Sequence, residues 1–413
     1  MKQIIGASFV VLCDAKFSVI KKGGILFENG EIVAVDSYLK LRKTYKEAKF
    51  LFYENCALTP AFANMHLHLE FSKNYGDFCF GDFGEWLDSV ILKREGLMEN
   101  LTPFMQEGVK QCLKSGVGFV GAVSSNGLDL EVLEKSPLRV LYFNEIIGSN
   151  VEALDFLYQN FLERFKDSKA RRNPKFTPAV AIHAPYSVHP MLLKKVLDFA
   201  KKQDLIISTH FLESKAEKEW LESSGGYFKG FYQKFFNKEL ESFYKPLEFL
   251  ENFKDIKNLY FTHCLEADLK ELESLEKLRA KIITCPKSNR LLNNKLLDLD
   301  RLKAFKIPLC VATDGISSND SLNLLDELRV ALFGYCGSEL ESLAKELILS
   351  VTRSPFLNTP FKLGELKAGN LADFALFRIP LTKEFLAHNL ILYTKEAEAL
   401  YINGEEILQC QRS

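Results

Sequence analysis

Short hydrophobic runs that end in polar residues alternate with longer amphipathic segments through the middle of the chain. There are eight such runs, at residues 57–66, 117–125, 138–146, 177–185, 205–211, 259–264, 281–286 and 307–315. Nearly continuous hydrophobic runs are typical of parallel strands that are covered on both faces. The segments between them, such as 192–200 and 269–278, carry apolar residues at helical spacing. Eight strand–helix repeats in series predict an α/β fold, a (β/α)8 TIM barrel.

The two ends of the chain have a different pattern. Residues 1–56 contain short alternating strands with a turn at Asn29-Gly30, and residues 357–413 contain similar strands with a turn at Asn403-Gly404. Asn-Gly pairs favour tight β-hairpins. We therefore predict a small β-sandwich domain made from residues 1–56 and 357–413, which flanks a barrel of residues 57–356.

Two of the connections between predicted strands are long. They run from His68 to Val117 and from Phe211 to Leu259, and each is expected to hold more than one helix. Both follow the carboxyl end of a strand, which is the active-site face of a barrel, so both are expected to wall or cover a pocket. The aromatic residues of the second connection either enclose an apolar ligand or form the core of its helices: Trp220, Tyr227, Phe228, Phe231, Tyr232, Phe235 and Phe236.

Composition narrows the range of partners and compartments. The 53 basic residues nearly balance the 54 acidic ones, so no overall positive charge favours nucleic acid. No stretch approaches 18 apolar residues, which argues against a membrane span. The 9 cysteines are scattered singly, as expected of reduced thiols in a cytoplasmic protein. The apolar run after Lys2 is interpreted as a buried strand because it has one charge and no cleavage site.

Five of the 7 histidines lie at or just after predicted strand ends: His66, His68, His183, His210 and His263. A lone histidine is usually structural, but this number at one end of one barrel favours a site. His66 and His68 are two apart on a strand, so both face the barrel mouth. Asp314 ends the eighth strand, which lies beside the first in a closed barrel. Three imidazoles and a carboxylate at one point suit zinc or another divalent metal.

Four further residues are weaker candidates. Glu213 follows His210 by three residues and is either a proton shuttle above the metal or a solvated carboxylate. His183 is a candidate for hydrogen bonding to a substrate. Arg290 either pairs with a substrate anion or, as we favour, with surface carboxylates. Trp86 either packs on a substrate or belongs to the core.

The motifs PAFANMHLH, HFLE, THC and ATDG, followed by GELKAGNLADFALF, resemble the amidohydrolase superfamily in its mononuclear deaminase and chlorohydrolase branch. The resemblance covers nearly the whole chain. It implies one divalent metal ion, zinc first and iron second, held by His66, His68, His210 and Asp314. It also implies catalytic roles for Glu213 and His263 beside Asp314. Dinuclear relatives have a carboxylated lysine where this chain has His183, which favours the mononuclear type.

Within that branch, segments such as HLHLEFS, FGEWLDSV and VAIHAPYSVHP are similar to the aminodeoxyfutalosine deaminases. This similarity implies hydrolytic removal of the 6-amino group of an adenine nucleoside with a carboxyphenyl chain, which gives futalosine and ammonia on the way to menaquinone. It also implies that Glu95 binds the ribose and that the chain forms a homodimer. Three alternatives stay open: a deaminase of S-adenosylhomocysteine, methylthioadenosine or adenosine; a chlorohydrolase; and a metal-binding barrel without catalysis.

Overall fold

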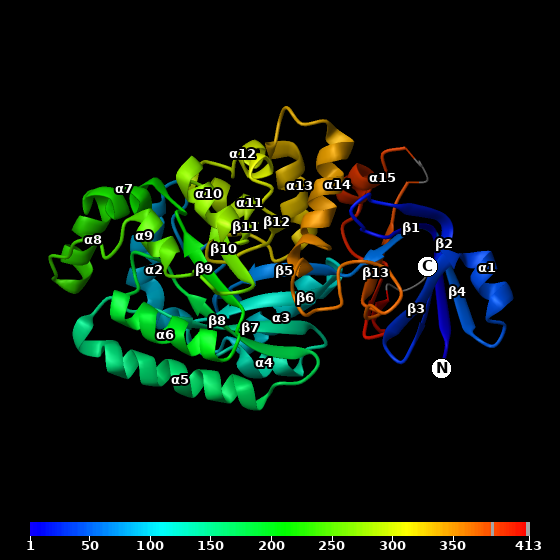
Figure 1. Cartoon of the computed structure of the whole chain (residues 1–413), viewed down its shortest axis with the longest axis horizontal. Coiled ribbons are helices and arrows are strands. Elements are labelled where there is room, and N and C mark those ends of the chain that lie inside the picture. Colours follow the sequence, from blue (N-terminus) through cyan, green and yellow to red (C-terminus); the bar gives the residue numbers. More distant parts are fainter. Residues whose placement is uncertain (381–383, 410–413) are drawn as a thin grey trace.

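The computed structural model describes residues 1–380 and 384–409, with side chains throughout except at 94–97 and 409. Eight parallel strands stand side by side in chain order and curve into a barrel (Figure 1). The predicted TIM barrel is therefore confirmed. Its strands are β5 (Phe62–Leu67), β6 (Val117–Ser124), β7 (Arg139–Ile146), β8 (Phe176–Ile182), β9 (Ile207–Phe211), β10 (Leu259–His263), β11 (Lys281–Thr284) and β12 (Leu309–Val311).

Helices surround the barrel strands, whose interior is filled by apolar side chains that include Met65, Phe143 and Tyr260. The barrel helices are α2 (Phe83–Leu97), α3 (Thr102–Lys114), α4 (Leu130–Lys135), α5 (Leu154–Ala170), α6 (Pro190–Lys202), α7 (Lys215–Ser223), α8 (Gly226–Phe236), α9 (Pro246–Glu251), α10 (Leu269–Lys277), α11 (Pro286–Asn293), α12 (Leu299–Ala304), α13 (Leu324–Gly334) and α14 (Leu340–Ser350). Short 3-10 turns lie at Leu69–Phe71, Val151–Ala153 and Ser354–Phe356.

Both ends of the chain contribute to one seven-stranded mixed sheet beside the barrel (Figure 1). The predicted small β-domain from the two termini is thus confirmed, while the residue at which it divides from the barrel stays a prediction. Separate apolar clusters, one with Phe374 and one with Tyr38, pack against this sheet. In spatial order the strands are β15 (Glu405–Gln409), β14 (Ala399–Ile402), β13 (Phe374–Arg378), β4 (Lys49–Pro60), β1 (Gln3–Val11), β2 (Val19–Glu28) and β3 (Glu31–Ser37), with helices α1 (Tyr38–Thr44) and α15 (Leu386–Tyr393).

The first predicted barrel strand, 57–66, is divided between the two sheets. β4 continues to Pro60 because residues 56–60 pair with β13, and β5 starts at Phe62. Between them, the Ala61 amide donates to the Asp373 carbonyl at 3.0 Å. Pro60 has no N–H to donate to a neighbouring strand, so hydrogen bonding within the terminal sheet is weakest there. This is the point at which the chain leaves that sheet and enters the barrel. One extended segment therefore joins the terminal sheet directly to the strand that carries His66.

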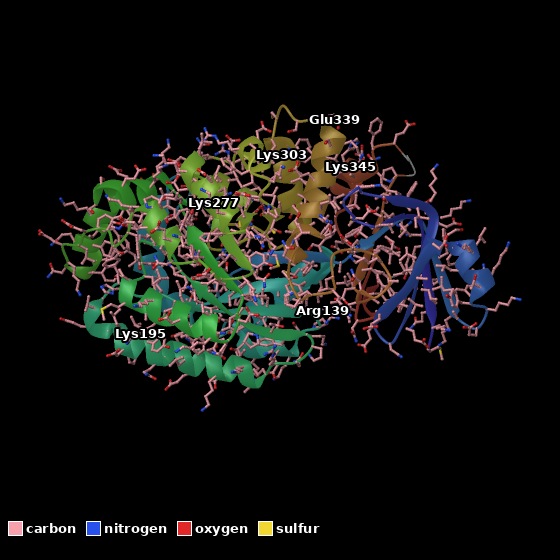
Figure 2. All side chains as sticks on the ribbon, viewed as in Figure 1. Arg139, Lys195, Lys277, Lys303, Glu339 and Lys345 are labelled. Carbon is pink, nitrogen blue, oxygen red and sulfur yellow. The ribbon has the colours of Figure 1, made fainter. Side chains whose placement is uncertain are left out.

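A buried ion pair joins the barrel to the terminal sheet. Arg139, at the start of β7, donates through Nε to Asp373 Oδ2 at 2.5 Å and through Nη2 to Oδ1 at 3.1 Å. The side chains are 4% and 3% exposed. Figure 2 places Arg139 at the boundary between the two parts, whereas labelled lysines such as Lys195 and Lys277 extend from the outer helices. This bidentate pair fixes how the two parts meet.

The long connections are helical, as predicted. The first contains α2 and α3, and the second contains α7, α8 and α9. Of the helices in the described part of the chain, none combines the length and apolar character that crossing a membrane requires.

Candidate metal and catalytic centre

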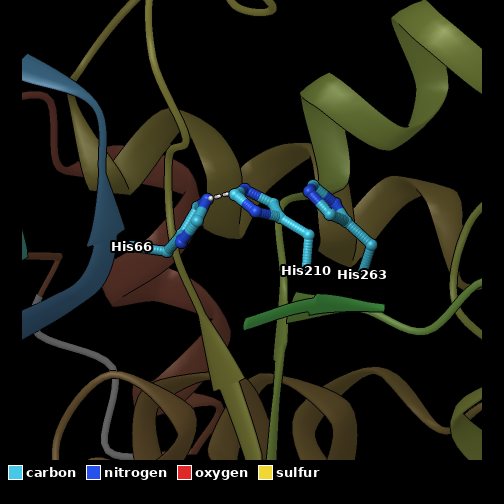
Figure 3. A group of neighbouring side chains, drawn as sticks. All are labelled: His66, His210 and His263. Atoms are coloured by element: carbon cyan, nitrogen blue, oxygen red, sulfur yellow. Dashed lines mark hydrogen bonds between the residues drawn. The ribbon is translucent and has the colours of Figure 1, made fainter. Parts of the chain in front are cut away.

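Three imidazole nitrogens meet at the carboxyl ends of the barrel strands. His66 Nε2 lies 3.1 Å from His68 Nε2 and 3.2 Å from His210 Nε2, and the last two are 3.3 Å apart. Figure 3 shows the rings of His66, His210 and His263 turned toward one another. Burial lowers the pKa of His68 to about 3, and neighbouring imidazoles contribute. The ring is therefore neutral at pH 7, which is the form that binds a metal.

Asp314 completes this group. Its Oδ1 is 3.6 Å from His66 Nε2 and 3.7 Å from His68 Nε2. Burial acts to raise the pKa of Asp314, but the hydrogen bond and charge of His66 outweigh it and hold that pKa well below its usual range. The serine hydroxyls of Ser288 and Ser318 donate to Oδ2 at 2.8 and 2.9 Å. Asp314 is therefore an oriented, ionised carboxylate.

The spacing of these atoms fits a single metal ion. A tetrahedral zinc ion with Zn–N bonds of 2.0–2.1 Å separates its ligand nitrogens by about 3.3–3.4 Å. Three Nε2 atoms at 3.1–3.3 Å cannot all hydrogen-bond one another, because each neutral ring carries one proton. The Nδ1 of His210 must carry that proton, since it lies 2.8 Å from the His183 carbonyl, which only accepts. Its Nε2 lone pair is then directed at the centre of the group.

His263 and Glu213 lie beside this group. His263 Nε2 is 3.5 Å from Glu213 Oε1 and 4.0 Å from Asp314 Oδ2. On the other side of the ring, Nδ1 donates to Asn289 Oδ1 at 2.8 Å, and Asn289 in turn donates to Thr284 Oγ1 at 3.0 Å. This chain of bonds places the His263 proton on Nδ1 and leaves Nε2 able to accept another. Burial lowers the pKa of His263, which favours the neutral base.

Glu213 is buried, and burial raises its pKa well above the usual range, with the charge of Asp314 adding to the shift. It is therefore a protonated acid near neutral pH. Its backbone N–H donates to Glu217 Oε2 at 2.8 Å, and Glu217 is in the first turn of α7. The helix start thereby fixes the position of the acid.

Two residues of the centre have left-handed backbone conformations. The φ angles of His263 and Asp314 are 71° and 63°. Non-glycine residues adopt this region at a cost, and such residues concentrate at functional sites. Here the turn aims each side chain across the mouth of the barrel at the point where its strand ends.

A cavity of about 460 Å³ opens above this centre. Its floor contains His68, His210, Glu213, His263 and Asp314, and α2 and α8 supply an apolar wall. Both long connections therefore line the pocket, as predicted. The wall residues include Trp86, Leu87, Val90 and Ile91 from α2 and Phe231, Tyr232 and Phe236 from α8. The volume lies in the range of small-molecule sites.

Of the four residues predicted to bind the substrate, the structure brings two into the cavity. His183 lines it, with Nδ1 2.6 Å from Ser187 Oγ, and Trp86 lines it with Nε1 donating to the Ser317 carbonyl at 2.8 Å. Arg290 instead lies exposed on α11, away from the cavity lining. Glu95 falls among the side chains outside the described part of the chain.

Several supporting residues carried no separate signal in the sequence. Ser288 orients Asp314, and Asn289 orients His263. Glu145, the penultimate residue of β7, lines the cavity although it was not singled out. Its signal was available: a charged residue at the carboxyl end of a barrel strand lies at the active-site face.

Fold and centre together define a class of hydrolase. A model of the amidohydrolase family matches residues 57–404, so the chain belongs to that family. The family depends on metal, and the His/Asp group above is able to hold an ion.

Relatives narrow the class further. The chain is 42% identical to an aminodeoxyfutalosine deaminase of Nitratiruptor sp. over 94% of its length and 96% of the relative's. It is 40% identical to an adenosine deaminase of Helicobacter pylori, over 99% and 100%. The solved structure of Helicobacter pylori aminofutalosine deaminase with methylthio-coformycin superposes with a TM-score of 0.94 at 38% identity, covering 98% and 100%. The predicted hydrolytic deaminase of the amidohydrolase class is confirmed.

Proposed function

We propose that this deaminase acts on aminodeoxyfutalosine, removing its 6-amino group to give futalosine and ammonia. The observation that carries this is the arrangement of Glu213 and His263, an acid and a base 3.5 Å apart, beside the imidazole group and under an apolar cavity. Two relatives with similar identity have names that differ in substrate, adenosine and aminodeoxyfutalosine. The deep apolar wall favours the substrate with the aromatic arm.

A basic side chain that contacts one residue of the cavity lining supports an anionic substrate. Lys238 Nζ donates to Asn150 Oδ1 at 2.6 Å, and Asn150 lines the cavity. The lysine is half-buried. A substrate carboxylate at Asn150 would therefore be able to pair with the Lys238 ammonium group beside the Asn150 amide.

We further propose zinc as the metal, held by His66, His68, His210 and Asp314. The donor set of three imidazoles and one carboxylate is one that zinc takes readily. When bound, zinc lowers the pKa of a water molecule toward about 7 and so supplies a nucleophile at neutral pH.

The residues of the chain then perform the proton transfers. Protonated Glu213 gives its proton to ring N1, which makes carbon 6 of the purine electrophilic. His263 Nε2, with Asp314 beside it, takes one proton of the attacking water as oxygen bonds to carbon 6. Glu213, now a carboxylate, takes the second proton of that water and passes it to the amine. The C–N bond breaks, ammonia leaves, and His263 returns its proton to Glu213 across the 3.5 Å that separates them.

A nucleoside panel with enzyme of measured metal content tests the proposal. Aminodeoxyfutalosine, adenosine, methylthioadenosine and S-adenosylhomocysteine are compared by ammonia release and by the change in adenine absorbance. We expect kcat/KM to be highest for aminodeoxyfutalosine, by about tenfold or more, because adenosine and methylthioadenosine have no carboxylate for Lys238 and S-adenosylhomocysteine has no aromatic ring for the apolar wall. Equal or greater kcat/KM for adenosine would overturn the proposed substrate. Activity that survives complete chelation would overturn the metal assignment.

A further inference from the structure

One polar corner of the cavity has no part in the proton transfers. Ser125, Asn126, Glu145 and His183 line it, at the ends of β6, β7 and β8. Polar groups placed in a mostly apolar pocket fix the orientation of a ligand and give specificity. We therefore expect these polar side chains to bind a polar part of the substrate.

Glu145 is the carboxyl group of this corner and is firmly held. It is 1% exposed. Its Oε2 accepts a short hydrogen bond from the Ser125 hydroxyl. Its backbone carbonyl accepts from Arg164 Nη2 at 2.7 Å, which anchors the end of β7. The side chain is thus presented to the cavity in one fixed orientation.

The second carboxylate oxygen has no partner. Glu145 Oε1 is buried and makes no hydrogen bond to any residue that the structure describes. Buried polar atoms are nearly always satisfied, and an unsatisfied one in a functional pocket is explained by a ligand that supplies the missing donor. A carboxylate oxygen calls for an O–H or N–H donor.

The position of Glu145 decides which donor it meets. Ligand atoms of Glu145, His183 and His210 lie within 4.8 Å of one another. His210 belongs to the imidazole group at the floor of the cavity, so Glu145 lies within the space that the substrate fills. An adenine nucleoside offers two kinds of donor, the 6-amino group and the sugar hydroxyls. The 6-amino group must face Glu213 and His263 to react, so the hydroxyls remain as donors for Glu145.

We propose that Glu145 Oε1 accepts a hydrogen bond from a ribose hydroxyl of the nucleoside, while Ser125 holds Oε2. This inference rests on the proposed class of substrate, an adenine nucleoside, but not on its carboxyphenyl arm. It makes Glu145 a specificity-determining residue that distinguishes ribonucleosides from their deoxy analogues.

The test is a cycle of two enzymes and two ligands. Wild type and Glu145→Ala are each measured with adenosine and with 2′,3′-dideoxyadenosine. In wild type we expect kcat/KM to fall about 10- to 100-fold when the hydroxyls are absent, because a buried acceptor is then left without a donor. In Glu145→Ala that difference should shrink to about threefold or less. The inference is overturned if Glu145→Ala prefers adenosine over 2′,3′-dideoxyadenosine as strongly as wild type does. It is also overturned if wild type shows no preference.

Three controls keep the result specific. Glu163→Ala, an exposed position on α5, should behave as wild type. Glu145→Gln keeps the size of the side chain and replaces the alanine variant if that fails to fold; its amide oxygen still accepts a hydrogen bond, so its discrimination should lie between those of Glu145→Ala and wild type. Metal content is measured in each, and loss of the metal from both Glu145 variants would show that Glu145 supports the ion instead and would overturn the inference.

Calorimetric binding separates this inference from the proposed function. If wild type deaminates no adenine nucleoside, the proposed function fails. The dissociation constants of adenosine and 2′,3′-dideoxyadenosine are then compared between wild type and Glu145→Ala. Stronger binding of adenosine that depends on Glu145 supports the inference without turnover, and its absence overturns it.

Discussion

The buried ionisable side chains at the two ends of strand β7 differ in whether all their polar atoms have hydrogen-bond partners. At its start, Arg139 and Asp373 satisfy each other, and Arg139 also donates to the Pro174 carbonyl at 3.1 Å. Near its end, Glu145 keeps one oxygen without a partner among the described residues. The paired end contributes to stability, whereas the unpaired end is available for a ligand. The same contrast separates the terminal-sheet junction from the candidate metal and catalytic centre as a whole.

Removing the acid of the centre should have the largest effect. Glu213→Gln keeps the shape but has no proton to give, so we expect kcat to fall about 10³-fold or more. Metal content and the free energy of unfolding should stay near wild type. Glu222→Gln, exposed on α7, is the control with normal turnover. Turnover near wild type in Glu213→Gln would exclude the acid role.

Breaking the paired end should act on stability instead. Arg139→Met leaves the buried Asp373 charge without its partner, and we expect the free energy of unfolding to fall by about 3–5 kcal/mol. Denaturant unfolding measures this, and kcat/KM of the folded variant should change little. Lys277→Met breaks an exposed pair with Glu273 and should cost about 0.5 kcal/mol or less. If Arg139→Met lost most of its turnover while its free energy of unfolding stayed unchanged, the paired end of β7 would not act on stability as we expect.

Another buried carboxyl group, that of Asp129, gives a pH-dependent comparison. Asp129 accepts from the Ser124 and Tyr142 hydroxyls at 2.7 and 2.8 Å. Burial, with the charge of Glu70 second, raises the pKa of Asp129 from 3.8 to about 7.

Because the folded state holds this proton more tightly, Asp129 stabilises the fold below pH 3.8, and that contribution is lost as pH rises to about 7. The free energy of unfolding of wild type should therefore decline between these values, with a slope of up to about 1.4 kcal/mol per pH unit. Asp129→Asn should remove this component, and the exposed Asp167→Asn should keep it. Identical pH profiles for Asp129→Asn and wild type would contradict the assignment.

The smallest expected effect lies at the cavity wall. Lys238→Met should raise KM for aminodeoxyfutalosine about tenfold through loss of one charge-assisted bond, and leave KM for adenosine unchanged. Steady-state kinetics with both nucleosides measure it. Lys229→Met, an exposed position on α8, is the matched control. An equal rise with both substrates would indicate a structural role for Lys238.

The sequence predicted those site residues that lie at the end of a recognisable hydrophobic run. Each hydrophobic run predicted one barrel strand, and His66, His210 and Asp314 could be placed because each lies at the end of such a run. Interactions between distant segments were not predictable. Asn289 orients His263 and Ser288 orients Asp314 only because α11 lies across the barrel mouth. Arg139 and Asp373 are 234 positions apart and meet only through the register of two sheets.

The strand that passes from one sheet to the other also constrains the order of folding. β4 leads into β5 through Ala61 alone, and β4 pairs on one side with β1 and on the other with β13. During synthesis, β13 emerges only after all eight barrel strands have been made. Until then one edge of β4 is without its strand, a few residues from His66, and unpaired edges favour association between chains. The nascent chain must therefore keep this edge covered until Phe374 and the residues that follow it arrive.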